Sequence, residues 1–194
     1  MDLDDIIRKD ASDVDPAPGS LLIANPVMSD SYFFRAVVLM LAKEDGDMGI
    51  VLNQPTNITL DLIIPGIGEN LPVFCGGPVD HERMFMLHRL PHIFEGSMRV
   101  CGDIYLGGNF EQLRKYLASG EPVEDNLRFY LGYSGWDAAQ LTTELINNYW
   151  AVNPKPEYSD LLRDTGDGYW RREVARLGEN YRSWLVVPEN PSMN

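Results

Sequence analysis

The stretch FRAVVLMLAKEDGDMGIVLN, residues 34–53, decides the fold. Residues 34–42 are almost wholly apolar and rich in β-branched side chains, which is typical of a strand buried on both faces. A short turn with a glycine follows at 43–47, and residues 48–53 form a second apolar run. Two such runs joined by a short turn predict an antiparallel hairpin.

Working outward from this hairpin, the pattern predicts strands before helices. Further strands are expected at 20–26, 72–76, 83–89, 99–108 and 127–133, each an apolar run next to Gly, Pro or Asn. Helices are expected at 59–64, 109–120, 137–150, 158–162 and 168–178. Strands thus dominate the first half and helices the second, which favours an α+β fold over βαβ alternation.

Length and charge narrow the classes further. The 194 residues suggest one domain at 20–194, preceded by an acidic arm at 1–19 that two prolines and a glycine set apart. The net charge of −13 argues against direct nucleic-acid binding, since that affinity depends on Lys and Arg neutralising phosphates. Arginines near the C-terminus alternate with carboxylates, which predicts a solvated face of mixed charge.

Two cysteines without a disulfide framework fit a cytoplasmic protein with buried, reduced thiols, and no apolar run is long enough to span a bilayer.

Two residues are candidate nucleophiles, Cys75 and Ser134. Cys75 and His81 flank the turn in FCGGPVDHERMFMLHR (74–89), so a hairpin could bring thiol and imidazole together. Ser134 lies in GYSGW, but a nucleophile elbow needs glycine where Trp136 stands. The segment SGWD instead predicts a capping box, with Ser134 and Asp137 at a helix start.

The sequence gives little support for a metal site or a phosphate-binding site. Pro91 separates His88 from His92 and prevents a helix from aligning them. Neither phosphate-loop motif is present, so Gly107 and Gly108 are expected to form a turn before a helix capped by Asn109. No metal and no cofactor is expected.

Four ordered motifs resemble the YqgE/AlgH family of bacterial proteins. They are GSLLIANPVMSDSYFFRAVVLML (19–41), GDMGIVLNQP (46–55), FCGGPVDHERMFMLH (74–88) and LGYSGWDAAQLTTELINNYW (131–150). The resemblance runs from about residue 19 to about residue 180 and implies a compact α+β fold: a bifurcated, largely antiparallel sheet, partly closed like a small barrel and surrounded by helices. It implies no reaction, although members are often labelled transcriptional regulators.

Two positions depart from the family pattern. Gln54 stands where the family usually has Arg, which argues against anion binding at that position. Ala139 stands where the family usually has Gly, and we expect this change to stabilise the helix mildly.

The leading hypothesis is an acidic, cytoplasmic, non-enzymatic protein that binds a protein or small-molecule partner and acts as a binding or regulatory protein. Polar and aromatic residues at the ends of expected elements could converge on one groove: Asn53, Arg83, His88, Tyr133, Trp136 and Gln140. The alternative for these residues is structural, with the two aromatic rings in the core and Gln140 bonded to backbone. Alternative functions are a hydrolase or thiol enzyme that uses Cys75 and His81, and a transcriptional regulator.

Overall fold

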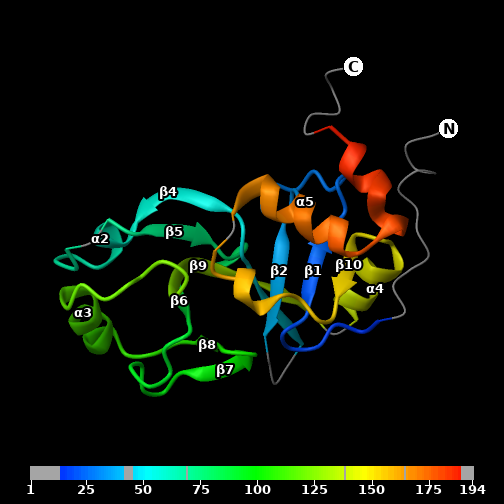
Figure 1. Ribbon diagram of the computed structural model, residues 1–194. Helices are drawn as coiled ribbons and strands as arrows, with labels where there is room; N and C mark the ends of the chain where they lie inside the picture. The colour runs from blue at the N-terminus through cyan, green and yellow to red at the C-terminus, as the bar shows by residue number, and fades with distance from the viewer. Residues whose placement is uncertain (1–13, 42–45, 69, 138, 164, 189–194) are drawn as a thin grey trace.

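The computed structural model describes residues 14–41, 46–68, 70–137, 139–163 and 165–188 (Figure 1). Most of the expected N-terminal arm, residues 1–13, lies outside this range. The strands are β1 (Leu21–Ala24), β2 (Val37–Leu41), β3 (Asp47–Val51), β4 (Pro55–Thr59), β5 (Pro72–Cys75), β6 (Val79–His88), β7 (Met98–Cys101), β8 (Ile104–Leu106), β9 (Leu127–Trp136) and β10 (Trp150–Asn153). The helices are α2 (Leu60–Ile63), α3 (Phe110–Ala118), α4 (Gln140–Ile146) and α5 (Gly166–Arg176), with short 3-10 helices η1 (Tyr158–Asp160) and η2 (Glu179–Val186).

One strand, β9, joins two halves of the sheet. The described strands run in the order β10-β1-β2-β3-β9-β6-β8-β7, and β5, which carries β4, also pairs with β9. Among these pairs β5–β9 is parallel and the others are antiparallel. The sheet therefore forks at β9 into a half-barrel, with α3 beside one half and α4 and α5 beside the other (Figure 1). The α+β fold with a bifurcated, largely antiparallel sheet is confirmed.

The predicted hairpin is present and explains why both faces of the sheet are covered. Strand β2 pairs with β3, with Val38 opposite Val51. Because side chains alternate along a strand, Leu39 enters one core while Val38 enters another. The first, the α5 core, lies under α5 and η2; the second, the α4 core, lies under α4; a third, the α3 core, fills the other half of the sheet under α2 and α3.

The Gly-Gly-Pro turn lets two stretches of backbone pack in direct contact. Gly77 has φ +147°, and a Cβ on it would lie 2.3 Å from the backbone carbon of Tyr133. A Cβ on Gly76 would lie 2.3 Å from the carbonyl oxygen of Gly132. The turn between β5 and β6 therefore rests directly on the backbone of β9, which no other residue type would allow.

Some expected elements differ from the structure. The strand expected at 99–108 is the hairpin β7–β8, bent at Gly102, where φ is +47°. Strands β4 and β10 were not expected, because β4 is polar and begins with proline and β10 is short. The helix expected at 137–150 is the shorter α4, and Asn148 beyond it has a left-handed φ of +58°.

Two expectations about helix starts near residue 137 were wrong. Ser134 lies inside β9, fully buried, and its hydroxyl donates to the carbonyl of Gly76 at 3.3 Å, so it caps no helix. Ala139 adopts the left-handed conformation, with φ +68°. A glycine would fit there without steric penalty, so alanine is strained at this position rather than helpful.

Other expectations are confirmed. The side chain of Asn109 accepts a bond from the Glu111 amide at 2.7 Å and caps α3. Both cysteines are free thiols, but the expected burial holds for Cys101 alone, because Cys75 is only half-buried. The C-terminal charges do mix: Arg176 pairs with Asp160 and Glu173, and Arg171 with Asp167. Within the described residues, no helix combines the length and apolar character needed to cross a bilayer.

Candidate ligand-binding site

A cavity of about 310 Å³ opens where the α5 core meets the α3 core, and we call it the inter-core cavity. Three segments distant in sequence form it: 71–74 at β5, 123–129 at the start of β9, and Leu162, Arg163 and Thr165 before α5. The parallel pairing of β5 with β9, Val73 opposite Phe129, holds the first two segments side by side. The third segment leads into α5, which begins at Gly166.

The walls of the inter-core cavity are mainly apolar. Phe74 and Leu162 belong to the α5 core, whereas Leu127 and Phe129 belong to the α3 core. Ligand pockets of this size are commonly lined by apolar side chains with a few polar groups that fix orientation. A wider hollow of about 830 Å³ lies beside α3, and most of the residues that line it are polar or charged, such as His92, Lys115 and Glu121.

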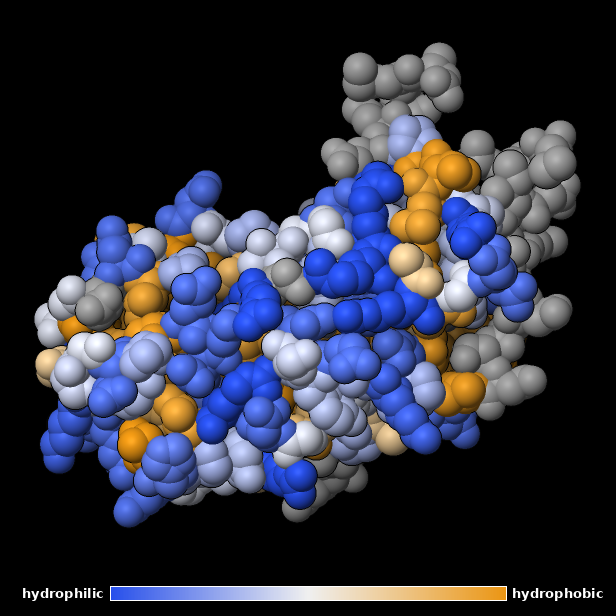
Figure 2. Space-filling model, in the orientation of Figure 1, coloured by the Kyte–Doolittle hydropathy of each residue, from blue (hydrophilic) through white to orange (hydrophobic). Residues whose placement is uncertain are grey.

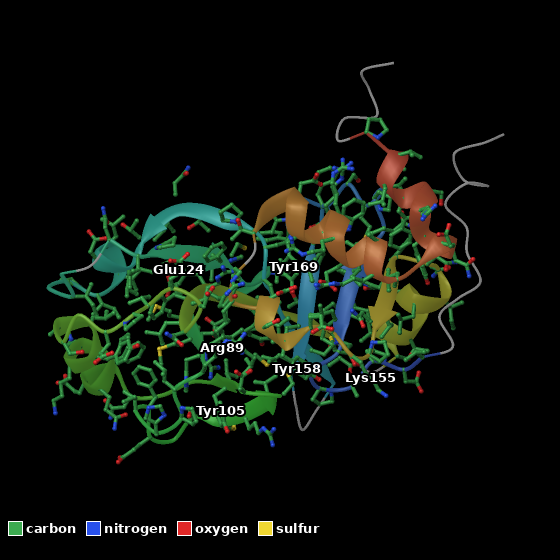
Figure 3. The ribbon with its side chains drawn as sticks, in the orientation of Figure 1. Arg89, Tyr105, Glu124, Lys155, Tyr158 and Tyr169 are labelled. Carbon is green, nitrogen blue, oxygen red and sulfur yellow. The ribbon has the colours of Figure 1, made fainter. Side chains whose placement is uncertain are left out.

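Charged groups gather at the mouth of the inter-core cavity. Arg163 donates two bonds to the Asp125 carboxylate, from Nε to Oδ1 at 3.1 Å and from Nη2 to Oδ2 at 2.7 Å. The Arg128 guanidinium, nearly buried, lies 4.6 Å from the centre of the Phe74 ring. Glu124 also lines the mouth, on the loop before β9 (Figure 3). The molecular face around it is largely hydrophilic (Figure 2).

Three guanidiniums act on the single carboxylate of Asp125. The hydrogen bond from Arg163 is the main cause that lowers the pKa of Asp125, and the charges of Arg163, Arg89 and Arg128 add to it. Arg89 also donates from Nε to the Asp125 carbonyl at 3.0 Å and from Nη2 to the Tyr158 carbonyl at 2.5 Å, and Figure 3 shows Arg89 beside Tyr158. Arginine side chains therefore surround the Asp125 carboxylate at the mouth.

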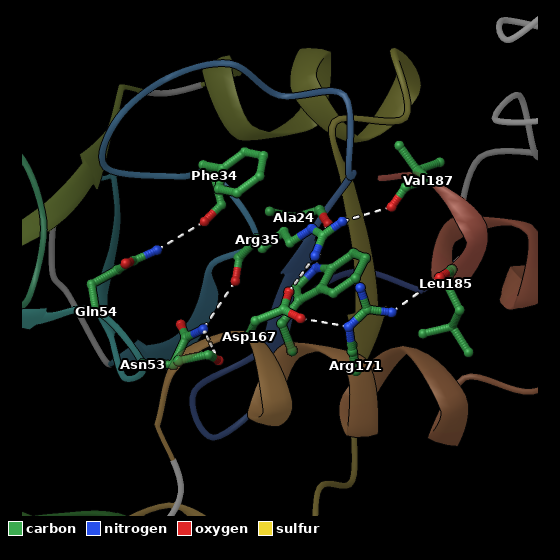
Figure 4. A network of polar contacts seen from close by, with 11 residues as sticks. Ala24, Phe34, Arg35, Asn53, Gln54, Asp167, Arg171, Leu185 and Val187 are labelled. Atoms are coloured by element: carbon green, nitrogen blue, oxygen red, sulfur yellow. Dashed lines mark hydrogen bonds and ion pairs between the residues drawn. The ribbon is translucent and has the colours of Figure 1, made fainter. Parts of the chain in front are cut away.

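Asn53, the first of the residues expected in a groove, is a structural hub (Figure 4). It is 1% exposed. Its Oδ1 accepts from the Val37 amide at 2.8 Å, and its Nδ2 donates to the carbonyls of Arg35 and Gly166, both at 2.9 Å. It also lines a small hollow of about 170 Å³ with Arg35 and Gln54. Asn53 therefore ties the chain before β2 to the start of α5.

Trp136 and Gln140 meet at a carboxylate that sequence reasoning missed. Glu144 Oε2 accepts from the indole of Trp136 at 2.8 Å and from that of Trp150 at 2.7 Å. The Gln140 amide donates to Oε1 of the same carboxylate at 2.9 Å, and its oxygen accepts from the Asp137 amide at 3.2 Å. Trp136 is buried in the α4 core.

Arg83 and Tyr133 meet at Phe85. The Arg83 guanidinium lies 5.0 Å from the centre of the Phe85 ring, and Tyr133 packs edge-on against that ring at 5.9 Å. His88 is fully buried instead between Phe94 and Tyr105, and its Nδ1 accepts from the Leu90 amide at 3.1 Å. The six expected residues thus divide into separate clusters: the Trp136–Gln140 pair, the Arg83–Tyr133 pair, the hub residue Asn53, and His88.

The thiol candidate has an unreactive setting. Burial raises the pKa of Cys75, and its Sγ faces the Gly77 carbonyl at 3.9 Å. His81 stacks on Tyr32, with ring centres 5.6 Å apart and Nε2 3.4 Å from the phenol oxygen. A nucleophilic thiolate needs a neighbour that lowers its pKa, and the burial of Cys75 acts in the opposite direction.

Sequence reasoning also missed the inter-core cavity. Its residues come from three segments. The parallel strands β5 and β9 pair residues 56 positions apart, such as Val73 and Phe129, and such a pairing leaves no local pattern in the sequence. The available signal was the C-terminal arginine cluster, which contains Arg163, but its partner Asp125 lies 38 residues earlier in the sequence.

Comparison with known proteins gives a consistent result. The model of a family described as AlgH-like matches residues 21–182. A UPF0301 protein from Parabacteroides distasonis is 37% identical over 94% of both chains, and one from Bacteroides thetaiotaomicron is 36% identical over the full length of both. The solution structure of AlgH from Pseudomonas aeruginosa has a TM-score of 0.68 at 26% identity, covering 90% of this chain and 98% of that one. A crystal structure of a protein from Corynebacterium diphtheriae, 20% identical over 90% and 94% of the two chains, shares the fold with a TM-score of 0.71.

Proposed function

The chain belongs to the AlgH-like family, and from that starting point we propose that it is a non-catalytic binding protein whose small-molecule ligand occupies the inter-core cavity. The observation that carries the proposal is the cavity itself: about 310 Å³, lined mainly by apolar side chains together with a few charged ones, Glu124, Asp125, Arg128 and Arg163. A site at the junction of two cores also lets a ligand influence how the two halves of the sheet pack. A regulatory action in the cytoplasm, where both thiols stay reduced, is part of this proposal.

The residues examined as catalysts support binding over catalysis. The raised pKa of Cys75 keeps its sulfur protonated at neutral pH, and Ser134 is fully buried within β9. Burial lowers the pKa of His88 to about 4, so its imidazole stays neutral near pH 7, and Nδ1 already accepts a backbone bond. A net charge of −13 likewise favours a ligand or protein partner over DNA.

The test is a titration with the neutral fluorophore N-phenyl-1-naphthylamine, whose emission rises in apolar surroundings. We expect saturable binding to one site on the full chain. The blocking variant is Thr165→Trp: Thr165 is exposed, lines the inter-core cavity and makes no side-chain cap bond at α5, so an indole there obstructs the mouth without removing a structural contact.

The matched control is Thr142→Trp, which adds the same bulk at an exposed position on α4. Saturable binding in the wild type and in the control, with loss in Thr165→Trp, supports the proposal. Absence of saturable binding to the wild type, or equal binding by both variants, refutes it.

A further inference from the structure

We propose that the ligand of the inter-core cavity is a small amphipathic acid, with an apolar body in the cavity and one anionic head that replaces Asp125 on Arg163. This inference rests on the proposed function and adds the chemical class of the ligand. It follows from the geometry of the mouth and from the balance of charge there.

The Asp125–Arg163 pair already has the geometry that an anionic ligand would need. The two parallel bonds, at 3.1 and 2.7 Å, use the edge of the guanidinium that suits a carboxylate or phosphate. Arg163 reaches the mouth from the segment before α5, whereas Asp125 comes from the loop before β9. The pair thus spans the entrance, where the head of a bound molecule would meet the solvent.

Exchange at this pair is energetically easy. The side chains of Arg163 and Asp125 are 59% and 37% exposed, and water screens such a pair so that it adds little to stability. Asp125 has a left-handed φ of +63°, a conformation that Asp and Asn adopt more readily than most other non-glycine residues. A ligand anion therefore replaces a weak, largely exposed contact.

The charges at the mouth favour replacement over addition. Arg128 and Arg163 line the cavity together with two carboxylates, those of Asp125 and Glu124. Arg89, which also acts on Asp125, is paired with Asp103, so a further anion would unbalance the site. If Asp125 turns out into water, one ligand anion restores the balance. Arg128 contributes a positive charge that is only 8% exposed and lies against the Phe74 wall, where the lower dielectric strengthens its attraction for an anion.

The experiment compares two fluorophores with one aromatic skeleton. Neutral N-phenyl-1-naphthylamine tests the cavity alone, and 8-anilinonaphthalene-1-sulfonate adds a single negative charge. At low salt we expect the sulfonate to bind about tenfold more tightly to the wild type, as one charge-assisted contact allows. We expect this preference to shrink as salt is raised.

Three variants locate the effect. Asp125→Asn removes the competing carboxylate and keeps a residue type that tolerates the left-handed conformation, so it should tighten the sulfonate about fivefold or more and leave the neutral probe unchanged. Arg163→Gln should weaken the sulfonate selectively. Arg182→Gln, which breaks the exposed pair with Glu179 on η2, is the control and should change neither probe.

The outcomes separate the two proposals. If the neutral probe binds but the sulfonate has no advantage, or Asp125→Asn leaves the sulfonate affinity unchanged, the assignment of an acidic ligand is wrong while the binding function stands. If neither probe binds the wild type, both are wrong.

Discussion

Replacing Asn53 with alanine should destabilise the protein more than any change in its surface polar groups. The substitution removes three hydrogen bonds of 2.8–2.9 Å and leaves the Val37 amide and the Arg35 carbonyl buried without their partner. Each orphaned buried group costs about 1–3 kcal/mol, so the free energy of unfolding should fall by roughly 3–5 kcal/mol. That is a large share of the 5–15 kcal/mol or so that typical domains possess.

Urea unfolding followed by tryptophan fluorescence measures this loss. The control is Asn126→Ala, which removes one exposed bond to the Pro122 carbonyl and should cost less than about 1 kcal/mol. A loss for Asn53→Ala no larger than that of Asn126→Ala would show that the hub does not hold the chain before β2 to α5.

Three further changes test local features. Ala139→Gly should raise the free energy of unfolding by about 0.5–1 kcal/mol, because relief of the left-handed strain outweighs the entropy that glycine adds to the unfolded chain. The control Ala175→Gly, inside α5, should lower it by about 1 kcal/mol. A loss of stability in both variants would contradict the left-handed conformation of Ala139. Because the pKa of His88 is lowered in the folded protein, the unfolded chain takes up this proton first as the pH falls, and the stability of the wild type decreases from pH 6.5 down to about 4. His88→Asn should remove about 3 kcal/mol of that decrease. Parallel plots of stability against pH for the two proteins would refute this. Glu144→Gln should lower the free energy of unfolding by about 1–3 kcal/mol and alter the near-ultraviolet dichroism of the tryptophans. A single amide oxygen cannot accept from Trp136, Trp150 and Gln140 as the carboxylate does. An unchanged spectrum and an unchanged stability would contradict this structural role of Glu144.

Sequence reasoning succeeded where the determinants are local or repeated. The two apolar runs at 34–42 and 48–53, joined by a short turn, specify the β2–β3 hairpin, and Asn109 specifies the cap of α3, because each acts on neighbouring residues. It failed at Ser134, since the capping pattern SGWD is local while the pairing of β9 with β3 is not. In this case tertiary pairing extended the strand through the expected cap.

The candidate site was beyond local patterns for the same reason. The six residues expected to share a groove were chosen for their places at the ends of expected elements, but such places do not say which ends meet. Glu144, whose carboxylate joins Trp136 to Gln140, could not be recognised from the sequence, because its shared role depends on β10 placing Trp150 beside α4.

The position of β1 in the sheet has a consequence for the nascent chain. β1 leaves the ribosome early, yet the partner on one of its edges is β10, with Leu22 opposite Val152. Until β10 emerges, one edge of an entirely apolar strand has unpaired backbone groups, a template for association with other chains. Synthesis that stalls before Trp150 would therefore release fragments that aggregate or need a chaperone, whereas a chain that includes β10 covers this edge of β1.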